Sequence, residues 1–236
     1  MKNKFTIDEV RSFWDKTAPI YDSQNKKMGY IHTQRFEKTI ELGQIRPGLK
    51  ILNIWSKTGV LISYLRKIGD IEIQNKEVSL EFVKIAQERY PQEKFELTDL
   101  ENLSEFGDNY FDRIISLETL EHTPSPDAFL KELHRILKPS GLLIMSLPPK
   151  GEEVPEFIYK IFFEDHGEGP HNFLWPGRVK KLLKKSGFNL IAHKPFIILP
   201  LRNDKLARTS EKILTFIFGK TPLANFGVRH FYVAKK

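Results

Sequence analysis

The strongest constraint on the fold is an alternation of strand-like and helix-like segments between Leu49 and about Leu147. The strand-like runs are short and apolar, whereas the segments between them carry apolar residues at the spacing of one helix face. Strands that alternate with helices in this way predict a parallel sheet with helices packed on both of its faces. The predicted strands are KILNI, IEIQ, KFELTDL, FDRIISL and LLIMSLP, and the predicted helices begin near Val60, Ser79 and Asp127.

The two flanks of this region differ in character. Before it, the runs TIDEVRSFWDKTAPIYDSQNK and HTQRFEKTIELG predict two helices, which we assign to an N-terminal helical cap over residues 1–45. After it, residues 149–176 are irregular and rich in Gly, Pro, His and acidic residues, which is typical of a lid or substrate-binding loop. The runs FNLIAHKPF and VRHFYVAKK predict the last strands of the sheet, so we expect one domain over residues 46–236.

The composition excludes several classes of protein. The 236 residues contain no cysteine, which excludes disulfides, thiolate metal sites and a cysteine nucleophile. The longest apolar runs are far shorter than the roughly 20 residues that span a bilayer, and the N-terminus shows no apolar signal segment. We therefore expect a cytoplasmic protein without a transmembrane segment.

The net charge of +7 permits an anionic partner without requiring one. Its densest patch is the run RVKKLLKKSGF, in which Val179, Leu182 and Leu183 fall on one helical stripe and the lysines on the other side. A helix that packs through its apolar stripe and exposes a solvated basic face explains this pattern, with a ligand-binding patch as the alternative. Because the chain has no base-holding motif of the Asn-Pro-Pro-Tyr type, nucleic acid is not the expected partner.

Three segments together resemble the class I S-adenosylmethionine-dependent methyltransferases, in the group that modifies small molecules, lipids and glycans. They are FWDKTAPIYD, FDRIISLETLEHTPSPDAFLKELHRILKPSGLLIMSLP and HNFLWPGRVKKLLKKSGF. The middle segment is the specific one, because it joins Leu-Glu-His, a Pro-rich turn, an amphipathic helix and Leu-Lys-Pro-x-Gly before an apolar strand. The resemblance implies a Rossmann-like doubly wound α/β fold, a mostly parallel sheet with an antiparallel last strand, and S-adenosylmethionine as cofactor.

The turn after the first strand departs from the family pattern. In the family this strand ends in an Asp and the turn reads Gly-x-Gly-Thr-Gly. Here Asn53 takes the position of the Asp, and Trp55 and Lys57 take the positions of the first two glycines. Only Thr58 and the packing glycine, Gly59, match. A left-handed backbone at Trp55 or Lys57 would cost about 1–2 kcal/mol each, and the missing carboxylate removes a charge-assisted hydrogen bond worth roughly 1.5–3 kcal/mol.

Other positions that the resemblance implies are intact. Glu77 falls where the family places the acid that binds the ribose hydroxyls, and Asp99 falls where its adenine-contacting acid lies. Both follow predicted strands at the carboxyl edge of a parallel sheet, where ligands bind in open α/β folds. The expected cofactor-binding residues are Asn53, Trp55, Lys57, Gly59, Glu77 and Asp99.

Three histidines are candidates for a general base. Methyl transfer depends mainly on positioning, and a base is needed only where the acceptor must lose a proton. His122 follows the fourth predicted strand, whereas His166 and His171 lie in the irregular loop; a surface or locally hydrogen-bonded role is the alternative for each. The acidic residues beside His166 lack the repeated spacing of a metal site, so no metal is expected.

Three functions remain open from the sequence. The first is a methyltransferase acting on a small-molecule, lipid-linked or sugar substrate through a rebuilt cofactor loop. The second is an inactive protein of the same fold, which has lost cofactor binding and serves as a partner-binding or regulatory subunit. The third is a binding protein for another nucleotide or anionic ligand, with Lys57 supplying the positive charge.

Overall fold

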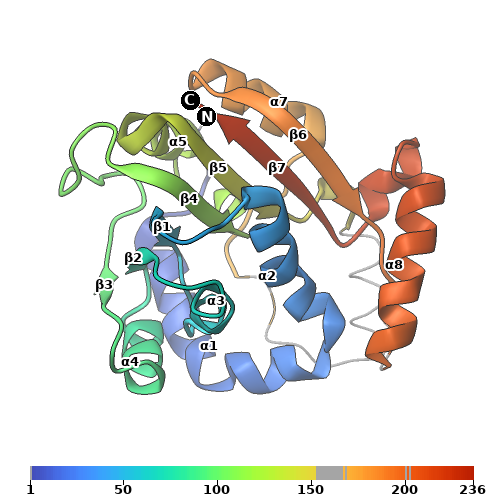
Figure 1. Cartoon of the computed structure of the whole chain (residues 1–236), viewed down its shortest axis with the longest axis horizontal. Coiled ribbons are helices and arrows are strands. Elements are labelled where there is room, and N and C mark those ends of the chain that lie inside the picture. Colours follow the sequence, from blue (N-terminus) through green and yellow to red (C-terminus); the bar gives the residue numbers. More distant parts are fainter. Residues whose placement is uncertain (1, 153–166, 168, 200, 202) are drawn as a thin grey trace.

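A seven-stranded sheet forms the centre of the protein, for which a computed structural model describes residues 2–152, 167, 169–199, 201 and 203–236 (Figure 1). The strand order is β3-β2-β1-β4-β5-β7-β6, and every neighbouring pair is parallel except the two pairs made by β7. The predicted doubly wound sheet with an antiparallel last strand is confirmed. The strands are β1 (Lys50–Ile54), β2 (Glu72–Glu77), β3 (Phe95–Leu97), β4 (Phe111–Leu117), β5 (Leu137–Leu147), β6 (Asn189–Phe196) and β7 (Arg229–Lys235).

Helices cover both faces of the sheet (Figure 1). Because side chains alternate along a strand, Leu52 of β1 packs in one cluster with α1, α5 and α7, whereas its neighbour Ile51 packs in another with α2 and α3. The helices are α1 (Ile7–Lys27), α2 (Tyr30–Gly43), α3 (Val60–Leu65), α4 (Leu80–Arg89), α5 (Pro126–Ile136), α7 (Pro176–Lys185) and α8 (Asp204–Phe218), with short 3₁₀ helices η1 (Leu120–His122), η2 (Lys150–Glu152) and η3 (Pro222–Phe226).

Several predicted boundaries agree with the structure, and one is wrong. The run FDRIISL is β4 from end to end, and Ser79 caps α4 by accepting a hydrogen bond from the N–H of Phe82 at 3.2 Å. The sequence pattern predicts that PSG ends the preceding helix and that the fifth strand, LLIMSLP, starts after it. In the structure β5 already begins at Leu137, which pairs with Phe111 of β4, and the register shifts further along the pair. The extended LKPSG segment therefore belongs to the strand, because β4 supplies it with a partner.

Helix α8 has no counterpart among the predicted elements. Asn203 caps it, with Oδ1 accepting hydrogen bonds from the N–H groups of Lys205 and Leu206 at 3.0 and 3.1 Å. Phe216 is 89% exposed, so the apolar residues of this helix do not all mark a face that packs on the sheet. No helix in the described ranges is long and apolar enough to cross a membrane.

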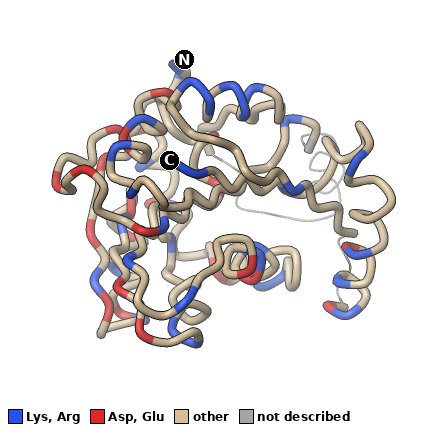
Figure 2. Tube along the Cα trace, turned by 45° about the horizontal axis from the view of Figure 1, so that its top comes forward, with Lys and Arg blue, Asp and Glu red and all other residues tan. Residues whose placement is uncertain are grey.

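Basic and acidic positions are interspersed along the chain (Figure 2). In α7 the predicted apolar stripe of Val179, Leu182 and Leu183 is buried, while the lysines on its other side are exposed. Lys185 pairs with Asp127 of α5 at 2.9 Å. The amphipathic packing predicted for this basic helix is confirmed.

An ion-pair cluster of one half-buried carboxylate and two buried arginines joins the N-terminal helices to the sheet. Glu118, directly after β4, pairs with Arg35 of α2 and accepts hydrogen bonds from Nε and Nη2 of Arg229 in β7 at 3.0 and 2.9 Å. Arg229 also donates to the carbonyl oxygen of Ile31 in α2 at 2.7 Å. Burial acts to raise the pKa of Glu118, but the two arginines outweigh it and lower the pKa to about 2. The cluster therefore holds α2 against the carboxyl end of β4.

The turn between β1 and α3 contains a glycine whose role is steric. Gly59 has a left-handed backbone with φ of 76°, and a Cβ atom there would lie 2.9 Å from Cζ of Phe95 and 3.0 Å from Cδ2 of Tyr90. These contacts agree with the packing role expected for Gly59.

Glu118→Gln should lower the free energy of unfolding by about 2–3 kcal/mol at pH 7, because it removes the carboxylate that pairs with two buried guanidinium groups. Folding lowers the pKa of Glu118 from 4.5 to about 2, so its stabilisation is complete above pH 4.5 and is lost as the pH falls toward 2. In urea titrations the difference between parent and variant should narrow below that pH. A difference that stays constant down to about pH 3 would contradict this account.

Gly59→Ala should lower the free energy of unfolding by about 2–4 kcal/mol, combining left-handed strain with overpacking against two aromatic rings. Gly48→Ala is the matched control, because Gly48 is also left-handed at φ of 79° but a Cβ atom there meets nothing within 4 Å. The control should lose only about 1–2 kcal/mol. Urea denaturation of both variants measures the difference, and equal losses would refute the packing role of Gly59.

Candidate functional site

The candidate site lies where the strand order reverses. From β1 the chain continues to β2 and β3 on one side, whereas β4 and β5 lie on the other. Ligands of open α/β sheets bind outside the carboxyl ends of the strands at this point. The turn after β1, residues 55–59, and Glu118 after β4 therefore flank the crevice in which a ligand is expected.

The turn after β1 keeps a left-handed backbone at the positions where the family has glycine. The φ angles are 59° at Trp55, 53° at Lys57 and 76° at Gly59. The left-handed geometry considered for Trp55 and Lys57 is thus present, at a cost of about 1–2 kcal/mol each. Other contacts of the turn must offset this strain.

Glu77 holds the turn to the end of β2. Its Oε2 accepts a hydrogen bond from the N–H of Lys57 at 2.6 Å, and its Oε1 accepts from the N–H groups of Val78 and Ser79 at 2.8 and 3.0 Å. Burial raises the pKa of Glu77 to about 7, while the neighbouring Lys57 and these N–H groups favour the ionised form. Both carboxylate oxygens of the expected ribose-binding acid are therefore bonded to the chain's own backbone.

Helix α1 packs over the turn after β1 and the turn after β2. Thr58 Oγ1 donates to Oδ1 of Asp22 at 2.7 Å, and Arg89 of α4 pairs with Asp22 while donating to the carbonyl oxygen of Thr58 at 3.2 Å. In the turn between β2 and α4, Ser79 Oγ donates to Oδ1 of Asp15 at 2.5 Å. These contacts fix α1 above the carboxyl ends of β1 and β2.

Trp55 fills the crevice beneath α1. Its indole is 3% exposed and meets the ring of Trp14 nearly at right angles, with the centroids 5.9 Å apart. The ring of His122 lies on another side, at a centroid distance of 5.0 Å. The side chain at the first glycine position therefore occupies space that a small residue would leave open.

The side chain of Lys57 ends among aromatic rings, which we call the aromatic cage: Trp14, Trp55, Phe82 and Tyr21. Its Nζ lies 3.4 Å from the ring centroid of Trp14 and 3.8 Å from that of Trp55, with Phe82 and Tyr21 at 5.4 and 5.9 Å. Within the described residues, this buried nitrogen has no hydrogen-bond acceptor. Burial lowers the pKa of Lys57 to about 7. Cation–π attraction to the two Trp faces favours the ammonium form, but the lowered pKa shows that burial disfavours this form more strongly.

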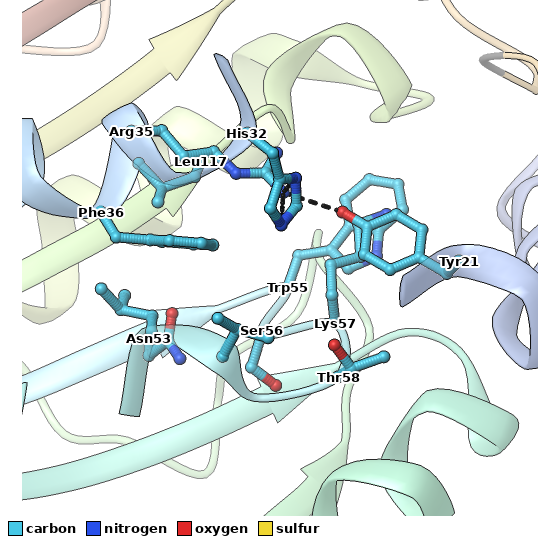
Figure 3. Close-up of a pocket in the computed structure, with 12 residues that line it drawn as sticks. Tyr21, His32, Arg35, Phe36, Asn53, Trp55, Ser56, Lys57, Thr58 and Leu117 are labelled. Atoms are coloured by element: carbon cyan, nitrogen blue, oxygen red, sulfur yellow. Dashed lines mark hydrogen bonds between the residues drawn. The ribbon is translucent and has the colours of Figure 1, made fainter. Parts of the chain in front are cut away.

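A small pocket remains beside the aromatic cage (Figure 3). Tyr21, His32, Arg35 and Phe36 face the turn residues across it (Figure 3). Its volume is about 30 Å³, whereas pockets for small-molecule ligands enclose about 300–1,000 Å³. Among the described residues, the space that Trp55 and Lys57 leave in this part of the crevice is therefore far smaller than such a pocket.

Of the remaining residues predicted to bind the cofactor, Asn53 lines the same pocket, whereas Asp99 lies apart from it. Asn53 is buried, and its Nδ2 donates to Oδ1 of Asn75 on β2 at 3.0 Å, so it links two strands. Asp99 is exposed beyond the end of β3, where its Oδ1 accepts from the N–H of Glu101 at 2.9 Å. The structure thus brings Asn53, Trp55, Lys57 and Glu77 to one crevice and leaves Asp99 at the edge of the sheet.

The candidate bases differ in their surroundings. His122 is buried, and its Nδ1 lies 2.9 Å from the carbonyl oxygen of Pro170, so Nδ1 carries the proton and Nε2 is the accepting nitrogen. Burial and the nearby Lys57 lower its pKa to about 3. His171 Nδ1 bonds the carbonyl oxygen of Gly169 at 2.8 Å, and the His122 and His171 rings are 6.2 Å apart. His166 lies outside the described residues.

The described ranges contain no group of three or more His, Asp or Glu side chains arranged to hold a metal ion. Of the aromatic partners of Lys57, Trp55 was among the predicted site residues, whereas Trp14, Tyr21 and Phe82 were not. Trp14 and Tyr21 lie two helical turns apart in the run FWDKTAPIYD, a spacing that places them on one face of α1. That spacing was the available signal, but it does not say which residue the face covers.

Comparisons with known proteins bear on this site. The family described as methyltransferase domain matches residues 53–145. The ubiquinone biosynthesis O-methyltransferase of Ruegeria pomeroyi is 27% identical over 207 residues, covering 80% of this chain and 82% of that protein. The demethylmenaquinone methyltransferase of Paenarthrobacter aurescens is 29% identical over 140 residues, covering 59% of this chain and 54% of that protein.

A solved structure shares the fold along nearly the whole chain. The crystal structure of the [4+2]-cyclase SpnF superposes with a TM-score of 0.73 at 16% identity, over 98% of this chain and 97% of that one. This likeness shows the fold, while the sequence matches include the turn after β1. In its strand order, in its crevice at the β1–β4 switch point and in the sequence of residues 53–145, the chain is similar to the class I S-adenosylmethionine-dependent methyltransferases.

Proposed function

We propose that this chain transfers the methyl group of S-adenosylmethionine to a small-molecule acceptor, and that the turn after β1 opens before the cofactor binds. The observation that carries the proposal is the position of Glu77 and Gly59 at the β1–β4 switch point of a methyltransferase fold. Bound S-adenosylmethionine would supply an activated methyl group. Opening of the turn would release Glu77 Oε2 from the N–H of Lys57 and free it for the ribose hydroxyls.

His122 is the proposed base for an acceptor that must lose a proton. Its Nε2 is the unprotonated nitrogen, because Nδ1 donates to Pro170. In the closed site, burial lowers its pKa to about 3, which makes it a weak base. Displacement of Trp55 would admit water and raise that pKa toward its ordinary range. His171, 6.2 Å away between ring centroids, and His166 are the other proposed candidates.

A quinone-type or phenolic ring is the proposed acceptor. Two relatives are named for ubiquinone biosynthesis and for demethylmenaquinone, which supports this class for the present chain. The proposed ring can be lipid-linked. We also propose a cytoplasmic location, a helical cap over residues 1–45 and a lid over residues 149–176. Residues 153–166 of the proposed lid lie outside the described residues.

The filled crevice favours one alternative function. A protein of this fold that binds no cofactor would serve as a partner-binding or regulatory subunit, and the closed turn with its buried Trp55 is what such a protein would show. The two functions differ in whether S-adenosylmethionine binds.

Calorimetric titration of the parent with S-adenosylmethionine should give saturable binding. Asp99→Ala should weaken it about tenfold or more, because a hydrogen bond to a charged group is worth roughly 1.5–3 kcal/mol. Asp99 is exposed and takes no part in closing the turn, so the variant tests cofactor contact alone. Asp70→Ala, at an exposed acid in the loop before β2, is the control and should bind as the parent does.

No binding to the parent at millimolar cofactor would overturn the methyltransferase proposal and favour the partner-binding alternative. Where binding is found, radiolabelled methyl transfer to a phenolic quinone precursor is the test of the acceptor class. Binding without transfer to phenolic rings would contradict that class and leave cofactor use intact.

A further inference from the structure

We propose that Lys57 is an internal ligand of the cofactor site, in which its ammonium group occupies the aromatic cage and a methyl-bearing cation competes with it. The cage is argued from this chain's own geometry. Only the identity of the competing ligand, the sulfonium of S-adenosylmethionine, rests on the proposed function.

The geometry around Nζ is that of a cation site. Trp14 and Trp55 stand at an interplanar angle of 87°, and Nζ lies over both faces, 3.4 and 3.8 Å from the two centroids. Phe82 and Tyr21 complete the cage at 5.4 and 5.9 Å. Cages of this kind recognise quaternary ammonium ligands and methylated lysine. A sulfonium is likewise a compact cation that carries a methyl group.

An ordinary structural lysine would have a different environment. Buried charges are usually paired or hydrogen-bonded, yet in the part of the chain described here Nζ of Lys57 has no acceptor. The carboxylate of Glu77 accepts a hydrogen bond from the backbone N–H of Lys57 and not from Nζ. The aromatic rings are therefore the direct contacts that stabilise the ammonium.

The location of the aromatic cage means that the contact of Lys57 with it restricts access to the ligand site. Lys57 belongs to the turn after β1, at the switch point where ligands of this fold bind, and the pocket left beside it has a volume of about 30 Å³. A ligand therefore meets a site that the chain has already filled. The apparent affinity of the ligand is its affinity for the open site multiplied by the fraction of molecules whose turn is open. Removal of the Lys57 side chain should therefore raise the apparent affinity.

The three tryptophans make the cage observable by fluorescence. Trp175 is 48% exposed and lies outside the cage, so Trp175→Phe leaves emission from Trp14 and Trp55 alone. In this background, tetramethylammonium chloride is the probe cation and sodium chloride is the ionic-strength control. Lys57→Gly empties the cage and also suits the left-handed backbone at this position. Lys67→Gly removes an exposed lysine of the same charge and is the matched control.

Lys57→Gly should respond to tetramethylammonium saturably, with a midpoint at least about tenfold lower than that of the parent. Lys67→Gly should follow the parent, and adding Trp55→Leu to Lys57→Gly should abolish the response. Equal midpoints for the parent and Lys57→Gly, or a response that survives Trp55→Leu, would overturn the proposal.

A second measurement uses the unaltered chain and does not depend on the folding of any variant. During reductive methylation followed by peptide mass spectrometry, Lys57 should react about tenfold or more slowly than exposed Lys67, because its Nζ is buried. Saturating tetramethylammonium should accelerate the reaction at Lys57 and not at Lys67. Equal rates without the cation would contradict an internal ligand.

Titration with S-adenosylmethionine separates this proposal from the proposed function. If Lys57→Gly binds tetramethylammonium but neither protein binds S-adenosylmethionine, the cage is supported and the methyltransferase proposal fails. If the parent and Lys57→Gly bind S-adenosylmethionine equally tightly, the methyltransferase proposal is supported and the internal ligand is refuted.

Discussion

The carboxylate of Glu77 accepts hydrogen bonds from three backbone N–H groups, and the closed crevice depends on this arrangement. One N–H belongs to Lys57 in the turn after β1, and the other two belong to Val78 and Ser79 before α4. The two turns at the switch point are thereby fixed to each other. With the backbone of Lys57 held on one side, its side chain is directed away from Glu77 and toward helix α1.

Helix α1 supplies contacts to the turn after β1 that a glycine-rich turn would not need. The ring of Trp14 contacts Nζ of Lys57, and Asp22 accepts a hydrogen bond from the hydroxyl of Thr58. The left-handed geometry of Trp55 and Lys57 costs about 2–4 kcal/mol in total. The contacts of Thr58, Ser79 and Arg89 with helix α1 hold the strained turn in place. The side chains of Trp14, Trp55 and Lys57 that pack there also fill the crevice.

The fold around this turn is that of the family. The sheet order, the ion-pair cluster of Glu118 with Arg35 and Arg229, and the packing of Gly59 against Phe95 do not require the missing glycines. The departure is confined to a few residues at the carboxyl end of β1. It alters access to the site and leaves the framework that positions the site unchanged.

The sequence by itself determined the sheet and most of its elements, because strand and helix periodicities are local properties. The run FDRIISL is β4, Ser79 caps α4, and the turn after β1 could be recognised by Gly59 and by its missing glycines. Helix α8 and the start of β5 at Leu137 were not predicted. The first exposes much of its apolar surface, and the second is extended because β4 lies beside it.

Only the tertiary structure decided what the residues at the glycine positions do. The aromatic cage joins Trp14 of α1, Trp55 and Lys57 of the turn, and Phe82 of α4, three segments far apart in the chain. Periodicity indicates which face of a helix is buried, but it does not indicate which side chain from another segment that face will meet. The partners of Lys57 follow from the packing of α1 over the carboxyl ends of β1 and β2, which only the folded chain specifies.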